Sequence, residues 1–259
     1  MTASALPNQN SNPRDWPTVA AQLADRQLPD GWELVNSSGF ARVAHNAEQR
    51  LFYKEFLPRS PLESVKATLR GSRATRARIH NDELRLAGFK APQNIAWGAL
   101  GSGAEYLIST AVPGHGVDDW LRRQLPPGDP SLFKKRRQLL SDLGQAVGRL
   151  HHTGFVHGDM RTGNVLADYR GGRFHFAYID NERNSRHKVA PGKFVARNLM
   201  QLNMHTPQEL SRSERWVFFQ AWRRQMRELS ETEANVLARE SFAWAMRRLA
   251  AKGKLVTSQ

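Results

Sequence analysis

Residues 157–166 hold the densest group of polar side chains whose spacing suggests chemistry. Asp159 and Asn164 lie five positions apart in this run, and a later apolar stretch, Phe176–Ile179, leads directly to Asp180. Phosphoryl transfer needs one carboxylate to orient the attacking hydroxyl, and an amide oxygen and a second carboxylate to hold Mg²⁺ on the phosphates. These three side chains are of the right types for that reaction.

Two short strands would have to bring these side chains together. Val165–Ala167 and Phe176–Ile179 both have the composition of buried strands. Asn164 comes just before the first strand and Asp180 just after the second. If the strands pair as a β-hairpin, both residues lie at one edge of it, next to the loop that carries Asp159.

The rest of the chain divides into two regions of different character. Strand-like runs dominate before residues 113–116, Pro-Gly-His-Gly, which we take as a hinge, and helical patterns dominate after it. We therefore expect an α+β protein with a β-rich first lobe at 16–113, a mainly helical second lobe at 114–259, and a disordered tail at 1–15. The elements expected in the first lobe are a strand at 50–56, a basic helix at 64–87 and a hairpin of 94–97 with 105–110. Those expected in the second lobe are helices at 117–125, 134–152, 194–203, 211–229 and 231–251.

The run His157-Gly158-Asp159 with Asn164 resembles a kinase catalytic loop of the H-R-D-x-x-x-x-N type, with glycine where protein kinases usually have arginine. Ile179-Asp180 stands where D-F-G would be, without its Phe or Gly. In this combination the chain resembles the bacterial lipopolysaccharide kinases that act on Kdo or heptose of the inner core. Segments 72–92, 194–202 and 212–222 are also similar to that family, so the resemblance covers about residues 35–225.

The resemblance implies a two-lobed protein-kinase-like fold, Mg²⁺ and ATP as cofactors, and a role for each site residue. Asp159 would be the catalytic base, with Arg161 near the transferred phosphate, and Asn164 and Asp180 would be the metal ligands. The residues implied for nucleotide binding are Lys54 on a third strand, Gly39 in a reduced glycine-rich loop, and Glu83 as the helix glutamate. Glu83 lies near the expected end of its helix, so the sequence leaves open whether Glu83 pairs with Lys54.

Several of these side chains also have ordinary structural interpretations. The histidine that opens such a loop more often binds backbone than acts as an acid or base, so we predict a structural role for His157. Arg161 is equally consistent with a surface arginine. The adjacent pair His151 and His152 cannot face one metal ion from a helix, and charge near a helix C-terminus is the simpler interpretation. Most aromatic residues of the C-terminal helices are predicted to be core, and the alternative is an amphipathic surface on an anionic membrane.

The net charge is unusual. Lys and Arg total 38 against 24 Asp and Glu, which gives +14 and favours an anionic partner. The N-terminal sequence lacks the features of a signal peptide, so we expect a cytoplasmic protein. There is no cysteine, which excludes a thiolate metal site and a cysteine nucleophile.

The leading hypothesis is a kinase that phosphorylates a sugar hydroxyl of the lipopolysaccharide inner core, with possible peripheral contact at the inner face of the inner membrane. Its partner would be an anionic glycolipid or sugar, and no specific nucleic acid is expected because no nucleic-acid motif supports the charge. The alternatives are a kinase of another small molecule or of a protein, and a pseudokinase that acts as a binding or scaffold module. The sequence does not predict the oligomeric state.

Overall fold

The computed structural model of the chain describes residues 15–58, 71–190 and 192–255. These residues form two compact units. The first unit comprises 15–58 and 94–111, and the second comprises 71–93 together with the described residues from 112 onward. This division differs from the expected one at residues 71–93, which pack with the second unit. Of the expected tail, residues 1–14 lie outside the described residues, whereas the Asp15 side chain caps the first helix.

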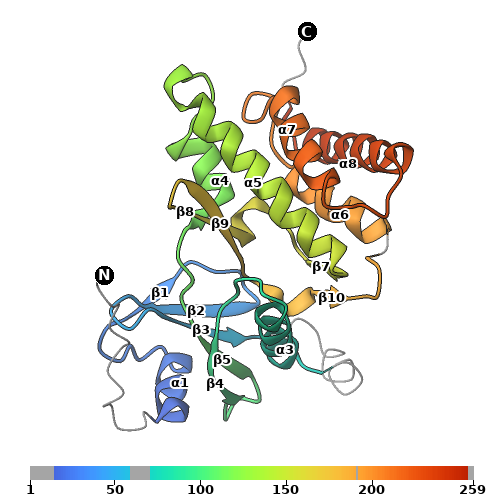
Figure 1. Ribbon diagram of the computed structural model, residues 1–259. Helices are drawn as coiled ribbons and strands as arrows, with labels where there is room; N and C mark the ends of the chain where they lie inside the picture. Colours follow the sequence, from blue (N-terminus) through green and yellow to red (C-terminus); the bar gives the residue numbers. More distant parts are fainter. Residues whose placement is uncertain (1–14, 59–70, 191, 256–259) are drawn as a thin grey trace, which may run out of the picture. The chain divides into compact units, whose positions relative to one another are not determined.

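A five-stranded antiparallel sheet with the strand order β1-β2-β3-β5-β4 forms the first unit (Figure 1). Its apolar face packs on helix α1, Trp16–Ala24, through a core that includes Leu23, Tyr53 and Ile108. In β3, alternate side chains face this core, as the sequence pattern predicts. The strands are β1 Trp32–Val35, β2 Ala41–Asn46, β3 Leu51–Phe56, β4 Asn94–Ala99 and β5 Glu105–Thr110.

Helix α3, Arg73–Leu86, begins where Ser72 accepts a hydrogen bond from the backbone N–H of Thr75. It ends before Gly88, whose φ of 81° fits the left-handed position that often follows a helix. The expected helix began at residue 64, and residues 64–70 lie outside the described residues. Leu84 joins the apolar core of the second unit, which is one reason why α3 belongs there.

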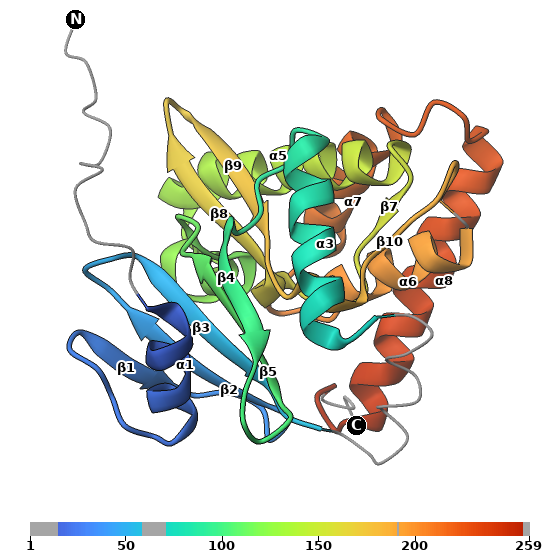
Figure 2. The ribbon, with the colours of Figure 1, turned by 90° about the horizontal axis from the view of Figure 1, so that it is seen from below.

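Helices dominate the second unit, as expected (Figures 1 and 2). The helix expected at 134–152 spans Phe133–His152 and buries an apolar stripe that includes Leu139, Leu143 and Val147. Gly144 and Gly148 on the same helix allow close packing, because a Cβ at either position would overlap the backbone of α7. The helices are α4 Val117–Asp119, which continues as a π-helical turn Trp120–Gln124, then α5 Phe133–His152, α6 Gly192–Leu202, α7 Arg212–Arg223 and α8 Glu231–Ala251.

Short strands connect these helices. The predicted hairpin is present, and its strands are longer than expected because the turn Gly171-Gly172 has φ of 57° and 74°, the values that a tight two-residue hairpin turn requires. The sheets of this unit have the orders β6-β8-β9 and β10-β7. The strands are β6 His115–Gly116, β7 Phe155–Val156, β8 Val165–Arg170, β9 Arg173–Tyr178 and β10 Ser185–Arg186.

Among the described residues, no helix is both long and apolar enough to cross a bilayer.

Candidate active site

His157 lies at the start of the loop that joins β7 to β8, and it is only 1% exposed. Its Nδ1 accepts the backbone N–H of Asp159 at 3.1 Å, so Nε2 carries the proton and donates to the carbonyl oxygen of Ile179 at 3.0 Å. Burial lowers the pKa of His157, which keeps the ring neutral. The geometry agrees with the structural role predicted for this histidine, since both ring nitrogens are occupied by backbone.

The carboxylate of Asp159 is held from two sides. Gln201 on α6 donates from Nε2 to its Oδ1 at 3.1 Å, and Nε of Arg161 lies 3.0 Å from the same oxygen. The carboxylate keeps 19% of its surface exposed, and Arg161 keeps 73%. Asp159 is therefore oriented and still accessible, which a group that takes a proton from a bound hydroxyl must be.

Asn164 and Asp180 lie at the same end of the β8–β9 hairpin, as its sequence pattern predicts. The strands pair Val165 with Tyr178, and the backbone N–H of Ile179 donates to the carbonyl oxygen of Asn164 at 3.0 Å. The side-chain amide of Asn164 donates to the backbone oxygen of Asp159 at 2.9 Å, which directs its Oδ1 elsewhere. The structure thus brings the three residues together through their backbone.

Asp180 has left-handed backbone angles, φ 60° and ψ 48°. This conformation is uncommon outside glycine and clusters at functional sites, where surrounding contacts hold it. Here it lies between Ile179, bound by His157, and Asn181, which is buried and donates to Asn81 of α3 at 2.8 Å and to the carbonyl oxygen of Tyr178 at 2.9 Å. Fixed contacts on both sides therefore orient Asp180.

The turn Asn181–Arg183 occupies the place of the missing Phe and Gly of D-F-G. Glu182 is buried with Arg73 of α3, and Nη2 of Arg73 lies 3.1 Å from Oε2 of Glu182. His80 on α3 also contacts the backbone oxygen of Asn181, at 2.8 Å. These contacts attach α3 to the segment after Asp180, which explains why α3 packs with the second unit.

Gly158 replaces the usual arginine of the loop for a steric reason. A Cβ at this position would overlap both the Cβ and the backbone oxygen of Arg183. Its own N–H donates to Oδ1 of Asn184 at 3.1 Å, and its carbonyl oxygen accepts from Arg197. The glycine thus allows the loop at 157–164 and the segment after Asp180 to pack directly on each other.

Sequence reasoning missed two residues of α6 that support this loop. Asn198 accepts from the backbone N–H of His157 at 3.1 Å and donates to its carbonyl oxygen at 2.6 Å. Gln201, one turn later, binds Asp159 and accepts the backbone N–H of Met160 at 3.0 Å. The only signal in the sequence is their i, i+3 spacing, which places both on one face of the helix expected at 194–203.

The prediction that His151 carries charge near the helix C-terminus is wrong, because its ring is buried and neutral. It is buried; its Nδ1 accepts from the indole N–H of Trp222 at 3.0 Å and its Nε2 lies 3.1 Å from Oδ1 of Asn198. Burial lowers its pKa to about 4. His151 therefore extends the network of His157 into the helical core, while His152 is exposed beside Glu228.

The residues expected to bind nucleotide lie in both units. In the first unit, Lys54 is on β3, paired with Val43 of β2 and Leu107 of β5, and Gly39 is exposed in the turn before β2. Glu83 lies in the last turn of α3, in the second unit. Their roles remain predictions.

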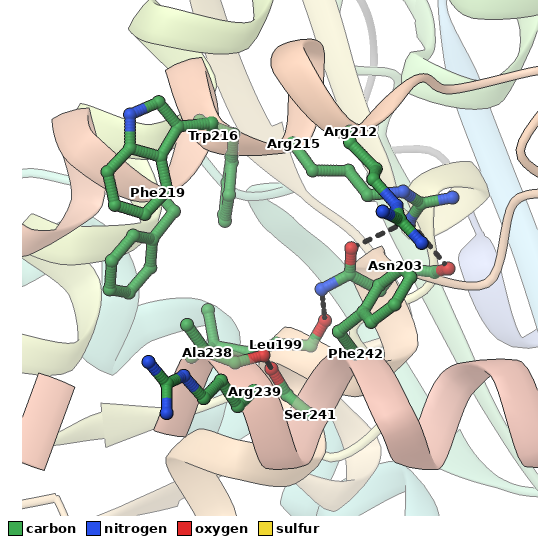
Figure 3. Close-up of a pocket in the computed structure, with 11 residues that line it drawn as sticks. Leu199, Asn203, Arg212, Arg215, Trp216, Phe219, Ala238, Arg239, Ser241 and Phe242 are labelled. Atoms are coloured by element: carbon green, nitrogen blue, oxygen red, sulfur yellow. Dashed lines mark hydrogen bonds between the residues drawn. The ribbon is translucent and has the colours of Figure 1, made fainter. Parts of the chain in front are cut away.

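The second unit also holds an apolar pocket of about 240 Å³ between α6, α7 and α8 (Figure 3). Phe218, Phe219 and Trp222 are buried, which confirms the predicted core role for them, whereas Trp216 is 55% exposed at the pocket. Arg215 crosses one end and donates to the side-chain oxygen of Asn203 at 2.7 Å.

Comparison with models of known protein families gives a match over most of the chain. A model of the family described as "Lipopolysaccharide kinase (Kdo/WaaP) family" matches residues 35–222. No curated protein matches the chain by sequence.

Three solved structures have a similar fold. WaaP, solved in complex with acyl carrier protein, aligns with a TM-score of 0.60 and 18% identity over 93% of both chains. The type VIII aminoglycoside-3′-phosphotransferase aligns at 0.57 and 15% identity, over 88% of this chain and 99% of that one. The aminoglycoside phosphotransferase APH(3″)-Id from Streptomyces rimosus aligns at 0.50 and 15% identity, over 89% and 98%. These likenesses confirm the predicted α+β, protein-kinase-like fold.

Proposed function

Because the chain belongs to the lipopolysaccharide kinase (Kdo/WaaP) family and is therefore a kinase, we propose that it transfers the γ-phosphoryl group of ATP, with Mg²⁺, to a sugar hydroxyl of the lipopolysaccharide inner core. The acceptor sugar is Kdo or heptose. One observation carries the proposal: hydrogen bonds through His157, Asn164 and Ile179 gather Asp159, Asn164 and Asp180 at one end of the β8–β9 hairpin.

Asp159 is the proposed base. It orients the acceptor hydroxyl and takes its proton as the sugar oxygen bonds to the γ-phosphorus and the electron pair of the broken P–O bond leaves with ADP. Its exposure and its contacts with Gln201 and Arg161 support this role. Arg161 is largely exposed, so solvent leaves room for its side chain to turn from Asp159 toward the transferred phosphate, where a guanidinium binds phosphate oxygens well.

Mg²⁺ fits the donors present. Asn164 offers an amide oxygen and Asp180 a carboxylate, which are the hard oxygen ligands that Mg²⁺ prefers alongside nucleotide phosphates. No cluster of three or more His, Cys, Asp or Glu side chains that could hold a metal occurs in the part of the chain that the structure describes. A site of two protein ligands agrees with a metal held largely by phosphate and water. When bound, the ion would neutralise charge on the phosphates.

The proposed nucleotide ligands are Lys54, Gly39 and Glu83. Lys54 projects from an interior strand of the five-stranded sheet, where neighbouring strands fix its backbone. Its ammonium group would neutralise the α- and β-phosphates, and the turn at Gly39 would approach them with its backbone. Glu83 is the helix residue that the family resemblance implies for the place of the helix glutamate of protein kinases.

The net charge of +14 supports an anionic acceptor. An inner-core glycolipid carries sugar carboxylates and lipid phosphates, and the proposed place of action is the inner face of the inner membrane. Contact there would be peripheral and electrostatic.

The test is transfer of labelled phosphate from ATP to purified inner-core glycolipid. We expect Mg²⁺-dependent labelling by the wild type and a loss of roughly 10²–10⁴-fold in kcat for Asp159→Asn. Asp168→Asn, the same change at a carboxylate on β8, is the matched control and should keep the activity. Equal background labelling by wild type and Asp159→Asn would refute the proposed acceptor. Binding of Mg-ATP without turnover on any acceptor would instead favour a pseudokinase.

A further inference from the structure

A second pocket, of about 290 Å³, opens beside the catalytic loop within the second unit. Residues 161–164 form one wall, Gln201 another, and the end of helix α8 a third. Two of these lining residues, Gln201 and Asn164, donate hydrogen bonds to Asp159. The pocket is therefore adjacent to the proposed base through direct contacts.

The pocket is strongly cationic. Its lining includes five basic side chains and one carboxylate, that of Asp118. Two of the basic side chains already have acidic partners: Arg122 lies 2.8 Å from Glu209, and Arg161 lies 3.0 Å from Asp159. The other three are Arg248, Lys252 and Lys254, all exposed, and none of them forms an ion pair with a described residue.

The turn at the end of α8 brings Arg248, Lys252 and Lys254 to the same pocket. Gly253 has φ 64°, and the N–H of Lys254 reaches back to the carbonyl oxygen of Leu249 at 3.0 Å, which closes a Schellman turn. The turn reverses the chain, so that residues on both sides of Gly253 line the same pocket as Arg248.

Stabilisation of the helix end does not account for this arrangement by itself. One cation near a helix C-terminus is favourable, but Arg248 and Lys252 are like charges at i and i+4, which destabilise a helix by a few tenths of a kcal/mol. A third cation, Lys254, follows on the same side. A bound anion would remove the repulsion that these three side chains otherwise impose on one another.

We infer that Arg248, Lys252 and Lys254 bind an anionic group, a carboxylate or phosphate, of the acceptor glycolipid, and so place its reactive hydroxyl at Asp159. This inference rests on the proposed function and assigns an acceptor site to the end of α8. Gln201 and Asn164, which line the same pocket, connect the bound acceptor to the catalytic loop.

The test compares two variants that lose the same charge. Arg248→Gln/Lys252→Gln removes two pocket cations, and Arg247→Gln/Lys134→Gln removes one exposed Arg and one exposed Lys outside the pocket. We expect the pocket variant to raise KM for the glycolipid roughly tenfold or more, because charge-assisted hydrogen bonds are lost. KM for ATP should not change. An equal rise in both variants, or no rise in either, would overturn the inference.

Modified acceptors identify which anion is bound. If the pocket binds a sugar carboxylate, reduction of the glycolipid carboxyls should raise KM for the wild type but not for the pocket variant, since the variant has already lost that contact. If it binds a phosphate, removal of the lipid phosphates should have that effect instead. The inference would be contradicted if each modification changed KM by the same factor for the wild type and for the pocket variant.

Calorimetry with the same glycolipid separates this inference from the proposed function. If the wild type binds the glycolipid but transfers no phosphate to it, and the pocket variant does not bind, the acceptor site stands and the proposed reaction fails. If the wild type transfers phosphate and the pocket variant behaves like the control variant, the reaction stands and the acceptor site fails. If neither binding nor transfer occurs, both fail.

Discussion

Nε2 of His157 lies 3.0 Å from the backbone oxygen of Ile179, and this contact joins the loop that carries Asp159 to the residue before Asp180. The same ring accepts the N–H of Asp159 at 3.1 Å. One buried, neutral imidazole thus fixes the backbone on both sides of the site. The role that we propose for His157 is to position the two carboxylates, Asp159 and Asp180.

His157→Ala should therefore reduce stability and activity together. It removes the partner of two half-buried backbone groups, the carbonyl oxygen of Ile179 and the N–H of Asp159, and opens a cavity, with an expected loss of about 2–4 kcal/mol in the free energy of unfolding. Denaturant titration measures that loss. The pH profile of the residual kcat separates positioning from acid–base catalysis: a positioning residue leaves its shape unchanged, whereas loss of one titrating limb would contradict our assignment.

Substitutions of Gln201 test whether its hydrogen bond to Oδ1 of Asp159 affects the carboxylate. Gln201→Glu keeps the size of the side chain and an oxygen for the N–H of Met160, but it places a second carboxylate against Asp159. Like charges disfavour ionisation, so the pH at which kcat/KM is half lost on the acid side should rise. Gln201→Ala, which lacks this repulsion, should lower kcat without that displacement. An unchanged acid limb in the glutamate variant would show that Gln201 does not act on the carboxylate.

The hairpin and its two site residues could be predicted from sequence because the pattern is local. Asn164 and Asp180 flank strands whose apolar residues are evident, and antiparallel pairing then fixes where both residues lie. The length of the strands was underestimated, although Gly171-Gly172 is a recognisable turn signal.

Other features depend on contacts between residues far apart in the chain. The assignment of α3 to the second unit depends on Arg73 and Glu182, which are 109 positions apart. The position of His151 near a helix C-terminus predicts a charged side chain, yet its actual partners, Asn198 and Trp222, are 47 and 71 positions away. Helical periodicity predicts which face is buried, but it does not predict which polar side chain finds a buried partner.

Removing one partner from the buried ion pair of Arg73 and Glu182 should cost far more than removing one partner from a surface pair. Arg73→Ala takes the buried partner from a carboxylate that is only 4% exposed and leaves it Arg183 at 3.7 Å, so we expect a loss of up to about 3–5 kcal/mol in the free energy of unfolding. Arg170→Ala, which breaks the exposed pair with Asp168, is the control and should cost at most about 1 kcal/mol. Chemical denaturation of both variants checks the difference. Equal losses would mean that α3 is not anchored by this pair.

Buried histidines make stability depend on pH. The pKa of His151 is lowered to about 4 by burial, against about 6.5 when unfolded. Between these values the unfolded chain binds a proton that the folded chain does not, so stability is full above pH 6.5 and falls as the pH drops toward 4. This histidine alone accounts for about 3 kcal/mol of that loss, and the lowered pKa values of His157 and His205 act in the same direction.

His151→Gln should therefore be less stable than the wild type at pH 7, with the difference narrowing toward pH 4. Unfolding free energies at several pH values measure this narrowing. His152→Gln, which removes the exposed neighbour, is the matched control. Narrowing of equal size in both variants would contradict the assignment of the effect to the buried ring.

Gly158 stands where protein kinases usually have arginine, and the structure predicts that no side chain fits at this position. Arg183 fills the space that any side chain there would need, so Gly158→Ala must push the catalytic loop away from the segment that follows Asp180. We expect a loss of about 1–3 kcal/mol in stability from this overpacking, with a fall in kcat because Asp159 and Asp180 separate. Gly163→Ala is the control for stability: its Cβ would lie 3.5 Å from the carboxylate of Asp118, an ordinary contact. Thermal unfolding with kcat measurement decides the matter, and a Gly158→Ala variant as stable and active as the wild type would show that the close packing of the two segments is not required.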